Sequence, residues 1–246
     1  FLDTRDQSSG DDISNTGFNM TKNRKFNIFF WFIIIGYIFY AALYIFRTSF
    51  MVGNERYFVL FDDAMISMRY AKHLAEGYGP VWNIGETPVE GYTNPLWMVF
   101  MSIFHFFPIP ASKTSLTIQI CGAIFLLLNL FYVKRLTELL TNNKIVPLLA
   151  TLLTALYIPL NNWGLQGMEV SILVLLLSLS LFLIFNEKKQ EQFSPIPYIL
   201  LGIGTLIRLD MSLPYVLILG FQLWVNPKHR RQIFFWGFGI LVGFQT

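Results

Sequence analysis

The sequence is poor in charge and in cysteine. Only 13% of its 246 residues are charged, whereas soluble domains carry about 25%. Cys121 is the single cysteine, which excludes an intramolecular disulfide and a cysteine-based metal site. The three histidines, His73, His105 and His229, lie far apart and lack the spacing of metal ligands. We therefore predict no metal site built from these residue types.

The sequence also lacks the phosphate-binding loops of soluble nucleotide enzymes. It contains neither a GxGxxG motif after a strand pattern nor a P-loop, and it shows no internal repeat. The net charge is only +3, and the basic residues stand in short clusters between apolar runs. Such clusters are typical of membrane-topology signals rather than of nucleic-acid binding. The expected partner is a membrane, and no nucleic acid is expected.

Long apolar runs are what the sequence has instead. Hydrophobic residues make up 54% of the chain and the mean hydropathy is +0.51. Several runs approach the length of about 20 residues that a membrane-spanning helix needs. We predict an all-α, polytopic transmembrane helical bundle. Its expected spans are residues 27–46, 114–133, 145–160 and 170–185, followed by an interrupted segment at 196–225 and a last run that reaches residue 246.

The two ends of the chain differ from this pattern. Residues 1–19 are polar and rich in Asp, Ser, Asn and Gly, which predicts a disordered tail or upstream or added sequence. Met20 opens a basic stretch of the kind that precedes a first membrane helix. The last apolar run is still continuing at Thr246. We interpret residues 20–246 as the N-terminal part of a longer transmembrane module.

Residues 47–113 are predicted to form a large first extracytoplasmic loop that contains juxtamembrane helices. Its apolar piece, residues 95–107, would rise only about 20 Å as a helix, against a hydrocarbon core of about 30 Å. We expect it to lie at the membrane surface or to re-enter without crossing. The basic clusters after residues 133 and 186 then fall on the cytoplasmic side, as the positive-inside rule requires.

The interrupted segment at 196–225 is predicted to be a hairpin with Arg208 and Asp210 at its tip. A hairpin keeps the next basic cluster, residues 228–231, cytoplasmic, and it places Asp62, Glu169 and Arg208 on one extracytoplasmic side. Its short arms leave the tip at membrane depth. Charge there is tolerated only against protein or a wet cavity, which indicates a functional site.

Asp62 and Asp63 are the first candidates for chemistry. They begin a helical pattern that stops at Gly77. A carboxylate beside a bilayer can act as a general base or bind a divalent cation. Alternatively, the pair caps this helix and meets its dipole. Arg69 lies seven residues after Asp62, on nearly the same helix face, where it could keep Asp62 ionised or contact an anionic ligand.

Further polar candidates follow along the chain: Glu90, Tyr92, Asn94, Glu169, Arg208 and Asp210. The first three could surround a polar substrate or serve only a turn. Glu169 could be an acid in the first turn of a span, favoured by the helix dipole. Arg208 is suited to a lipid phosphate, although it could also pair with Asp210 or extend to the surface.

Four motifs in this order resemble one family: DDAMISMRYA at 62–71, EGYTNPLW at 90–97, GME at 167–169 and RLD at 208–210. They are similar to the polytopic GT-C class of glycosyltransferases, in the branch that uses polyprenyl-phosphate sugars and includes the mycobacterial terminal arabinofuranosyltransferases. The likeness covers roughly residues 27–246. Family members often have an aromatic where Met65 stands and Pro where Leu209 stands.

The resemblance implies an inverting sugar transfer from a polyprenyl-phosphate-linked donor to a hydroxyl of a cell-envelope glycan, glycolipid or protein. The site would be extracytoplasmic, in a bacterial inner or plasma membrane. The family's acidic base maps onto Asp62, with Asp63 as the second candidate. Some members use a divalent cation, so a metal requirement stays open. The alternative is a transporter or flippase in which Arg208 and Asp210 mark a translocation path.

Overall fold

The computed structural model of the chain describes residues 8–87, 89, 91–190 and 192–243, and this part is mostly α-helical. The strands β1 (Phe50–Val52) and β2 (Glu55–Tyr57) form one short antiparallel hairpin. The helical class predicted from the apolar runs is therefore confirmed.

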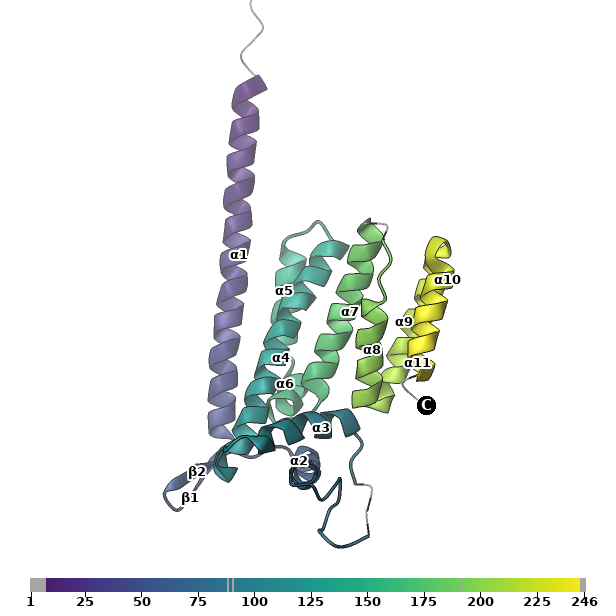
Figure 1. Cartoon of the computed structure of the whole chain (residues 1–246). Coiled ribbons are helices and arrows are strands. Elements are labelled where there is room, and N and C mark those ends of the chain that lie inside the picture. Colours follow the sequence, from purple (N-terminus) through teal and green to yellow (C-terminus); the bar gives the residue numbers. More distant parts are fainter. Residues whose placement is uncertain (1–7, 88, 90, 191, 244–246) are drawn as a thin grey trace, which may run out of the picture.

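Most helices lie side by side as one array (Figure 1). They are α1 (Ser8–Arg47), α4 (Ala111–Leu140), α5 (Ile145–Ala155), α6 (Ile158–Leu165), α7 (Val170–Gln190), α8 (Ile196–Ile207) and α9 (Ser212–Val225), followed by α10 (Arg230–Ile233), the π-helical turn Phe234–Phe238 and α11 (Gly239–Gly243). Within the described residues, three helices are long and apolar enough to cross a membrane, or four if the bent pair α5–α6 counts as one span. These lengths suit an integral membrane protein.

The third expected span differs from its prediction. The chain bends by 54° between α5 and α6, and Pro159 stands in the first turn of α6 instead of ending a helix. Proline lacks the N–H that an interior position must donate, so it fits a first turn and favours a new helix there. Residues 161–165 are therefore helical, beyond residue 160, where the span was expected to end.

The first helix also extends further than predicted. α1 begins at Ser8, so residues 8–19 continue the helix through the polar segment for which disorder was predicted. Once a helix is nucleated, each added residue forms a backbone hydrogen bond whatever its side chain, so composition alone is a poor guide to the boundary. Residues 1–7 lie outside the described residues.

α8 and α9 form the predicted hairpin. Arg208 is extended, with φ −152° and ψ 125°, and a short 3₁₀ turn (Leu209–Met211) follows it before α9 begins. The tip of the hairpin lies at the end of the array where α2 and α3 lie (Figure 1). The two charged side chains Arg208 and Asp210 are therefore at this tip, as expected.

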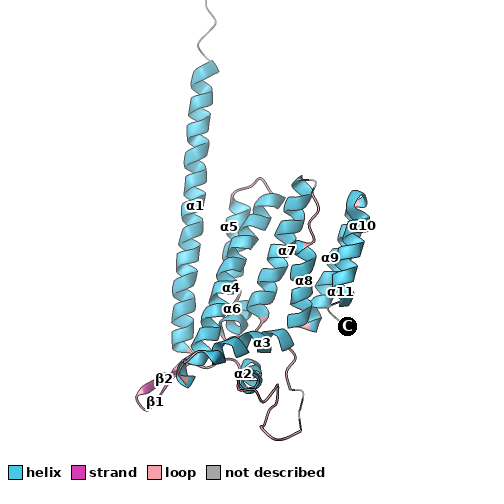
Figure 2. Ribbon diagram, in the orientation of Figure 1, coloured by secondary structure: helices cyan, strands magenta, loops and turns pink. Residues whose placement is uncertain are grey.

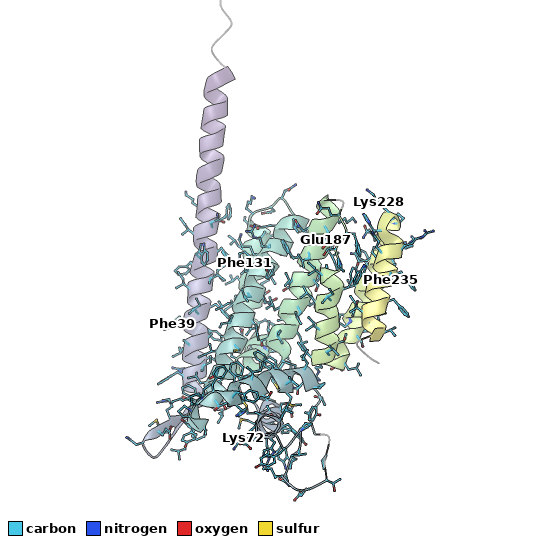
Figure 3. The ribbon with its side chains drawn as sticks, in the orientation of Figure 1. Phe39, Lys72, Phe131, Glu187, Lys228 and Phe235 are labelled. Carbon is cyan, nitrogen blue, oxygen red and sulfur yellow. The ribbon has the colours of Figure 1, made fainter. Side chains whose placement is uncertain are left out.

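The segment between α1 and α4 covers one end of the array, which we call the loop end (Figure 2). It contains α2 (Asp62–Ala75), α3 (Pro95–Ile103) and the 3₁₀ turn Phe104–Phe106. α3 runs across the ends of the array helices instead of alongside them, as expected for an apolar helix too short to cross a membrane. The opposite end, which we call the far end, carries Glu187 and Lys228, whereas Lys72 marks the loop end (Figure 3).

α3 is fixed to the array by its apolar face. Trp97 is 1% exposed, stacks on Phe100 at a centroid distance of 4.8 Å and meets Phe125 of α4 edge-on. Met101 beside it is fully buried. Each aromatic pair contributes about 0.5–1.5 kcal/mol beyond area burial. This packing holds the residue that begins α3, and the loop before it, against the array.

Candidate active site

The backbone that leads into α2 is held by buried glutamine and by the turn after α6. Gln119 of α4 is fully buried and donates its Nε2 hydrogen to the Val59 carbonyl at 3.1 Å. The Phe61 N–H donates to the Gln166 carbonyl at 2.9 Å. These two hydrogen bonds hold Val59 and Phe61 against the array. The position of Asp62, the next residue, is therefore set by the array and not by a free loop.

Asp62 and Asp63 occupy the first turn of α2, and both are exposed. The Asp63 N–H donates to Asp62 Oδ1 at 3.0 Å. The first turn of a helix, with its free N–H groups and the positive end of the helix dipole, is a common position for acidic side chains. Within the described part of the chain neither carboxylate forms an ion pair. Both are therefore available to a ligand as proton acceptors.

A buried chain of hydrogen bonds begins one turn further along α2. Ser67 Oγ donates to Asn94 Oδ1 at 2.8 Å, and Asn94 Nδ2 donates to Glu169 Oε2 at 2.9 Å. All three side chains are buried. Asn94 stands at the N-cap of α3 but makes no side-chain cap bond. Its amide group instead bonds Ser67 of α2 and Glu169, the residue before α7. The chain links three segments that are far apart in the sequence.

Arg208 completes this network. Its Nη1 donates to Glu169 Oε1 at 2.7 Å and its Nε donates to Asp210 Oδ2 at 2.8 Å. Glu169 is fully buried, whereas the side chain of Arg208 is 36% exposed and that of Asp210 is 76% exposed. A buried carboxylate is tolerated only when paired and hydrogen-bonded, and Glu169 has both kinds of partner.

The electrostatics of Arg208 favour its charged form. The hydrogen bond to Asp210, followed by that to Glu169, raises the pKa of the guanidinium above its ordinary value. Within the described residues its Nη2 makes no hydrogen bond. The guanidinium is held on two sides and is partly exposed, so its remaining donors could contact an anion such as a phosphate.

The turn before α7 positions Glu169 and depends on a glycine. Gly167 has φ +86°, a conformation that side-chain-bearing residues rarely adopt. A Cβ there would lie 2.7 Å from Leu60 Cδ2. The Gly167 carbonyl accepts a hydrogen bond from Trp97 Nε1 at 3.1 Å, which joins this turn to α3. The GME motif is thus held between the start of α2 and the packed face of α3.

The interpretation of Arg69 as a partner of Asp62 is wrong. Arg69 donates from Nε to the Trp82 carbonyl and from Nη2 to Asn83 Oδ1, both at 2.8 Å. Its guanidinium also lies over the Trp82 ring, 4.3 Å from the centroid. Two residues that are seven positions apart in a helix lie on the same face, but they are about 10 Å apart along the axis. This distance is too long for direct pairing. Arg69 instead fixes the loop that follows α2.

The motif at 90–97 joins the buried hydrogen-bond network through Asn94, and Trp97 joins the turn before α7. Tyr92 packs edge-on against Tyr70, 5.0 Å between centroids, and makes no hydrogen bond within the described residues. Its contact with a polar substrate stays a prediction. Gly91 allows this close approach, because a Cβ there would lie 2.6 Å from Tyr70 Oη. Glu90 lies outside the described residues.

Two polar residues of the site, one in the network and one that holds the backbone before α2, were not selected from the sequence. Ser67 lies four residues after Asp63, and its hydroxyl also donates to the Asp63 carbonyl at 3.3 Å, so helical spacing could have identified it. Gln119 is a polar residue within an apolar run, which was a signal for a buried contact. Its Oε1 is buried without a hydrogen-bond partner among the described residues.

Metal binding has no clear basis in the arrangement of side chains. Among the described residues, no group of three or more His, Cys, Asp or Glu side chains could hold a metal ion. Asp62 and Asp63 are the adjacent carboxylates that would contact a divalent cation carried by a ligand.

Comparison with known proteins does not identify a function for this chain. No family model, no curated protein and no solved structure matches it. Any functional assignment therefore depends on the residues described above and on the chemistry that they allow.

Proposed function

We propose that this chain is part of a membrane glycosyltransferase of the GT-C type, which transfers a sugar from a polyprenyl-phosphate donor to an acceptor hydroxyl. One observation carries the proposal. Ser67, Asn94, Glu169 and Arg208, which come from four separate motifs, form one continuous chain of hydrogen bonds beside the helix that begins with Asp62. Four motifs with unrelated structural roles would not be expected to form one hydrogen-bond network.

The distribution of basic residues supports an extracytoplasmic site. Lys134, Lys144 and Lys188 stand towards the far end of their helices or in the loops there, and Lys228 lies at the same end (Figure 3). Basic residues are enriched on the cytoplasmic side of membrane proteins. We therefore place the far end in the cytoplasm and the loop end, with its carboxylates and Arg208, outside. A lipid-linked donor needs no nucleotide-binding domain there.

In the proposed reaction, an exposed carboxylate of α2 acts on the attacking hydroxyl and Arg208 acts on the leaving phosphate. Asp62 takes the proton of the acceptor hydroxyl as its oxygen attacks the anomeric carbon. The bond between that carbon and the phosphate oxygen breaks with inversion, and the electron pair leaves with the polyprenyl phosphate. Arg208 holds that phosphate and stabilises its developing charge. Glu169 and Asp210 orient Arg208, and Asp63 is the second candidate for the base.

The transport alternative is not favoured by the position of the charges. A translocation path requires polar groups along the depth of the membrane. Arg208, Asp210 and Glu169 instead gather at one end of their helices, beside α2 and α3. This is the geometry of a site at a membrane surface.

The test is an assay of sugar transfer in membranes from cells that express the protein from its own gene. A panel of radiolabelled polyprenyl-phosphate sugars is supplied, and label in polar acceptors is measured with and without EDTA. We expect transfer from one donor, and Asp62→Asn should reduce it by about 10²–10⁴-fold, the usual contribution of a general base. Movement of lipid or sugar across the bilayer without transfer would favour the transporter.

A further inference from the structure

Three cavities with lining residues in common follow one another along α1, beside the helices α4–α6, and we call them together the α1 groove. The first, about 240 Å³, lies at the far end and is lined by Lys134, Glu138 and Lys144 among others. It shares Phe26 and Leu148 with a second cavity of about 350 Å³. The second shares Phe29 and Leu152 with a third of about 470 Å³.

The groove changes character along its length. Lys134, Lys144 and one acid, Glu138, line the far-end cavity, and Lys25 lines the cavity that follows it. Lys134 pairs with Glu138 at 2.6 Å, whereas Lys25 and Lys144 form no ion pair among the described residues. Two exposed ammonium groups are therefore left for an anion at the mouth of the groove.

The rest of the groove is apolar. Beyond Phe29 its walls are built mainly from side chains such as Phe32, Ile33, Tyr40 and Leu156. From Phe26 to Tyr40 the helix rises by about 21 Å, which exceeds the thickness of about 15 Å that one leaflet contributes to the hydrocarbon core. A basic mouth followed by an apolar channel of this length suits an anionic phospholipid.

We propose that the α1 groove binds an anionic phospholipid of the leaflet at the far end, with its phosphate at Lys25 and Lys144 and an acyl chain along α1. Basic pockets between membrane helices on the cytoplasmic side select anionic head groups in this way. The lipid would fill the space between α1 and α5, and so would hold α1 in the array. The proposal requires membrane insertion and is independent of sugar transfer at the loop end.

The head-group contact is tested by native mass spectrometry of the 246-residue chain after mild extraction. The probes are phosphatidylglycerol, phosphatidylcholine of the same chains, and inorganic phosphate. We expect phosphatidylglycerol to be retained. Lys25→Gln with Lys144→Gln should weaken binding by about 25-fold, at about fivefold for each lysine near the lipid surface. Lys188→Gln with Arg231→Gln removes two charges outside the groove and should leave binding unchanged.

The acyl-chain contact is tested with two glycines. A Cβ at either Gly36 or Gly220 would meet nothing within 4 Å, so the two positions are matched in the space next to the backbone. Only Gly36 lines the groove. Gly36→Leu should therefore abolish lipid retention, and Gly220→Leu should not. Equal retention of both phospholipids, full competition by inorganic phosphate, or unchanged retention in Gly36→Leu would each overturn the proposal.

Discussion

At the scale of single residues, the site is organised by one buried carboxylate. Glu169 has no exposed surface and depends on Asn94 and Arg208 for its hydrogen bonds. Asp210 also pairs with Arg208, but its side chain is 76% exposed. The two ion pairs should therefore differ greatly in their contribution to stability, since water screens the second pair and not the first.

This difference can be measured with two substitutions. Arg208→Leu leaves Glu169 as a buried carboxylate without its cation, so it should lower the free energy of unfolding by about 3 kcal/mol. Asp210→Asn removes only an exposed partner and should cost about 1 kcal/mol or less. Thermal unfolding in detergent compares the two variants. Equal losses would show that Glu169 does not depend on Arg208 in the way its burial suggests.

The candidate residues were predictable from the sequence where charge stood in an apolar context. Glu169, Arg208 and Asp210 were selected for that reason, and they share one network. Helical periodicity misled for Arg69, because a shared face does not bring side chains two turns apart into contact, and a loop carbonyl offered a nearer partner. Tyr92 looked polar by type, yet its ring packs against Tyr70.

At the scale of elements, two transverse helices and one turn hold the site together. α2 and α3 pack against each other and across the ends of the array. The turn before α7 reaches both, since Gln166 accepts a hydrogen bond from Phe61 and Gly167 accepts one from Trp97. The position of Asp62 relative to Glu169 therefore depends on the shape of this turn.

The role of this turn can be tested by comparing substitutions at two glycines that have the same backbone angle φ. Gly77 and Gly167 both have φ +86°, but a Cβ would meet nothing within 4 Å at Gly77 and would lie 2.7 Å from Leu60 at Gly167. Gly77→Ala should cost about 1 kcal/mol of unfolding free energy from backbone strain. Gly167→Ala should cost about 1–3 kcal/mol more from overpacking. If chemical denaturation gives equal losses, the turn does not hold Leu60 as described.

Element boundaries were less predictable than element types. The crossing helices were expected from apolar length, and α3 was expected to be too short to cross. The bend between α5 and α6 was not expected, because a proline in an apolar run can end one helix or open the next. Contacts from α6 to the rest of the array decide between these, and a local pattern does not contain them.

At the scale of the whole molecule, the account separates two ends of one helical array. The loop end holds the carboxylates, the buried network and Arg208, and the far end holds Lys228 and the mouth of the α1 groove (Figure 3). If the array lies in a membrane, these two ends face different compartments. The proposed chemistry and the proposed lipid site then belong to opposite leaflets.

Sidedness can be checked with single cysteines in a Cys121→Ala background. Thr93 is exposed at the loop end, and Asn142 is exposed between α4 and α5 at the far end. A membrane-impermeant maleimide should label Thr93→Cys on intact cells, and should label Asn142→Cys only after the cells are permeabilised. The reverse pattern would contradict the placement of Asp62 and Arg208 outside the cytoplasm.

The most direct test of the central claim separates donor binding from turnover in two variants. Asp62→Asn should still bind the polyprenyl-phosphate sugar with nearly unchanged affinity while losing transfer, because the base acts only on the acceptor. Arg208→Gln should lose donor binding by about tenfold or more, because a charge-assisted contact to phosphate is removed. Transfer that survives in Asp62→Asn and Asp63→Asn alike, or donor binding unaffected by Arg208→Gln, would contradict the proposed site.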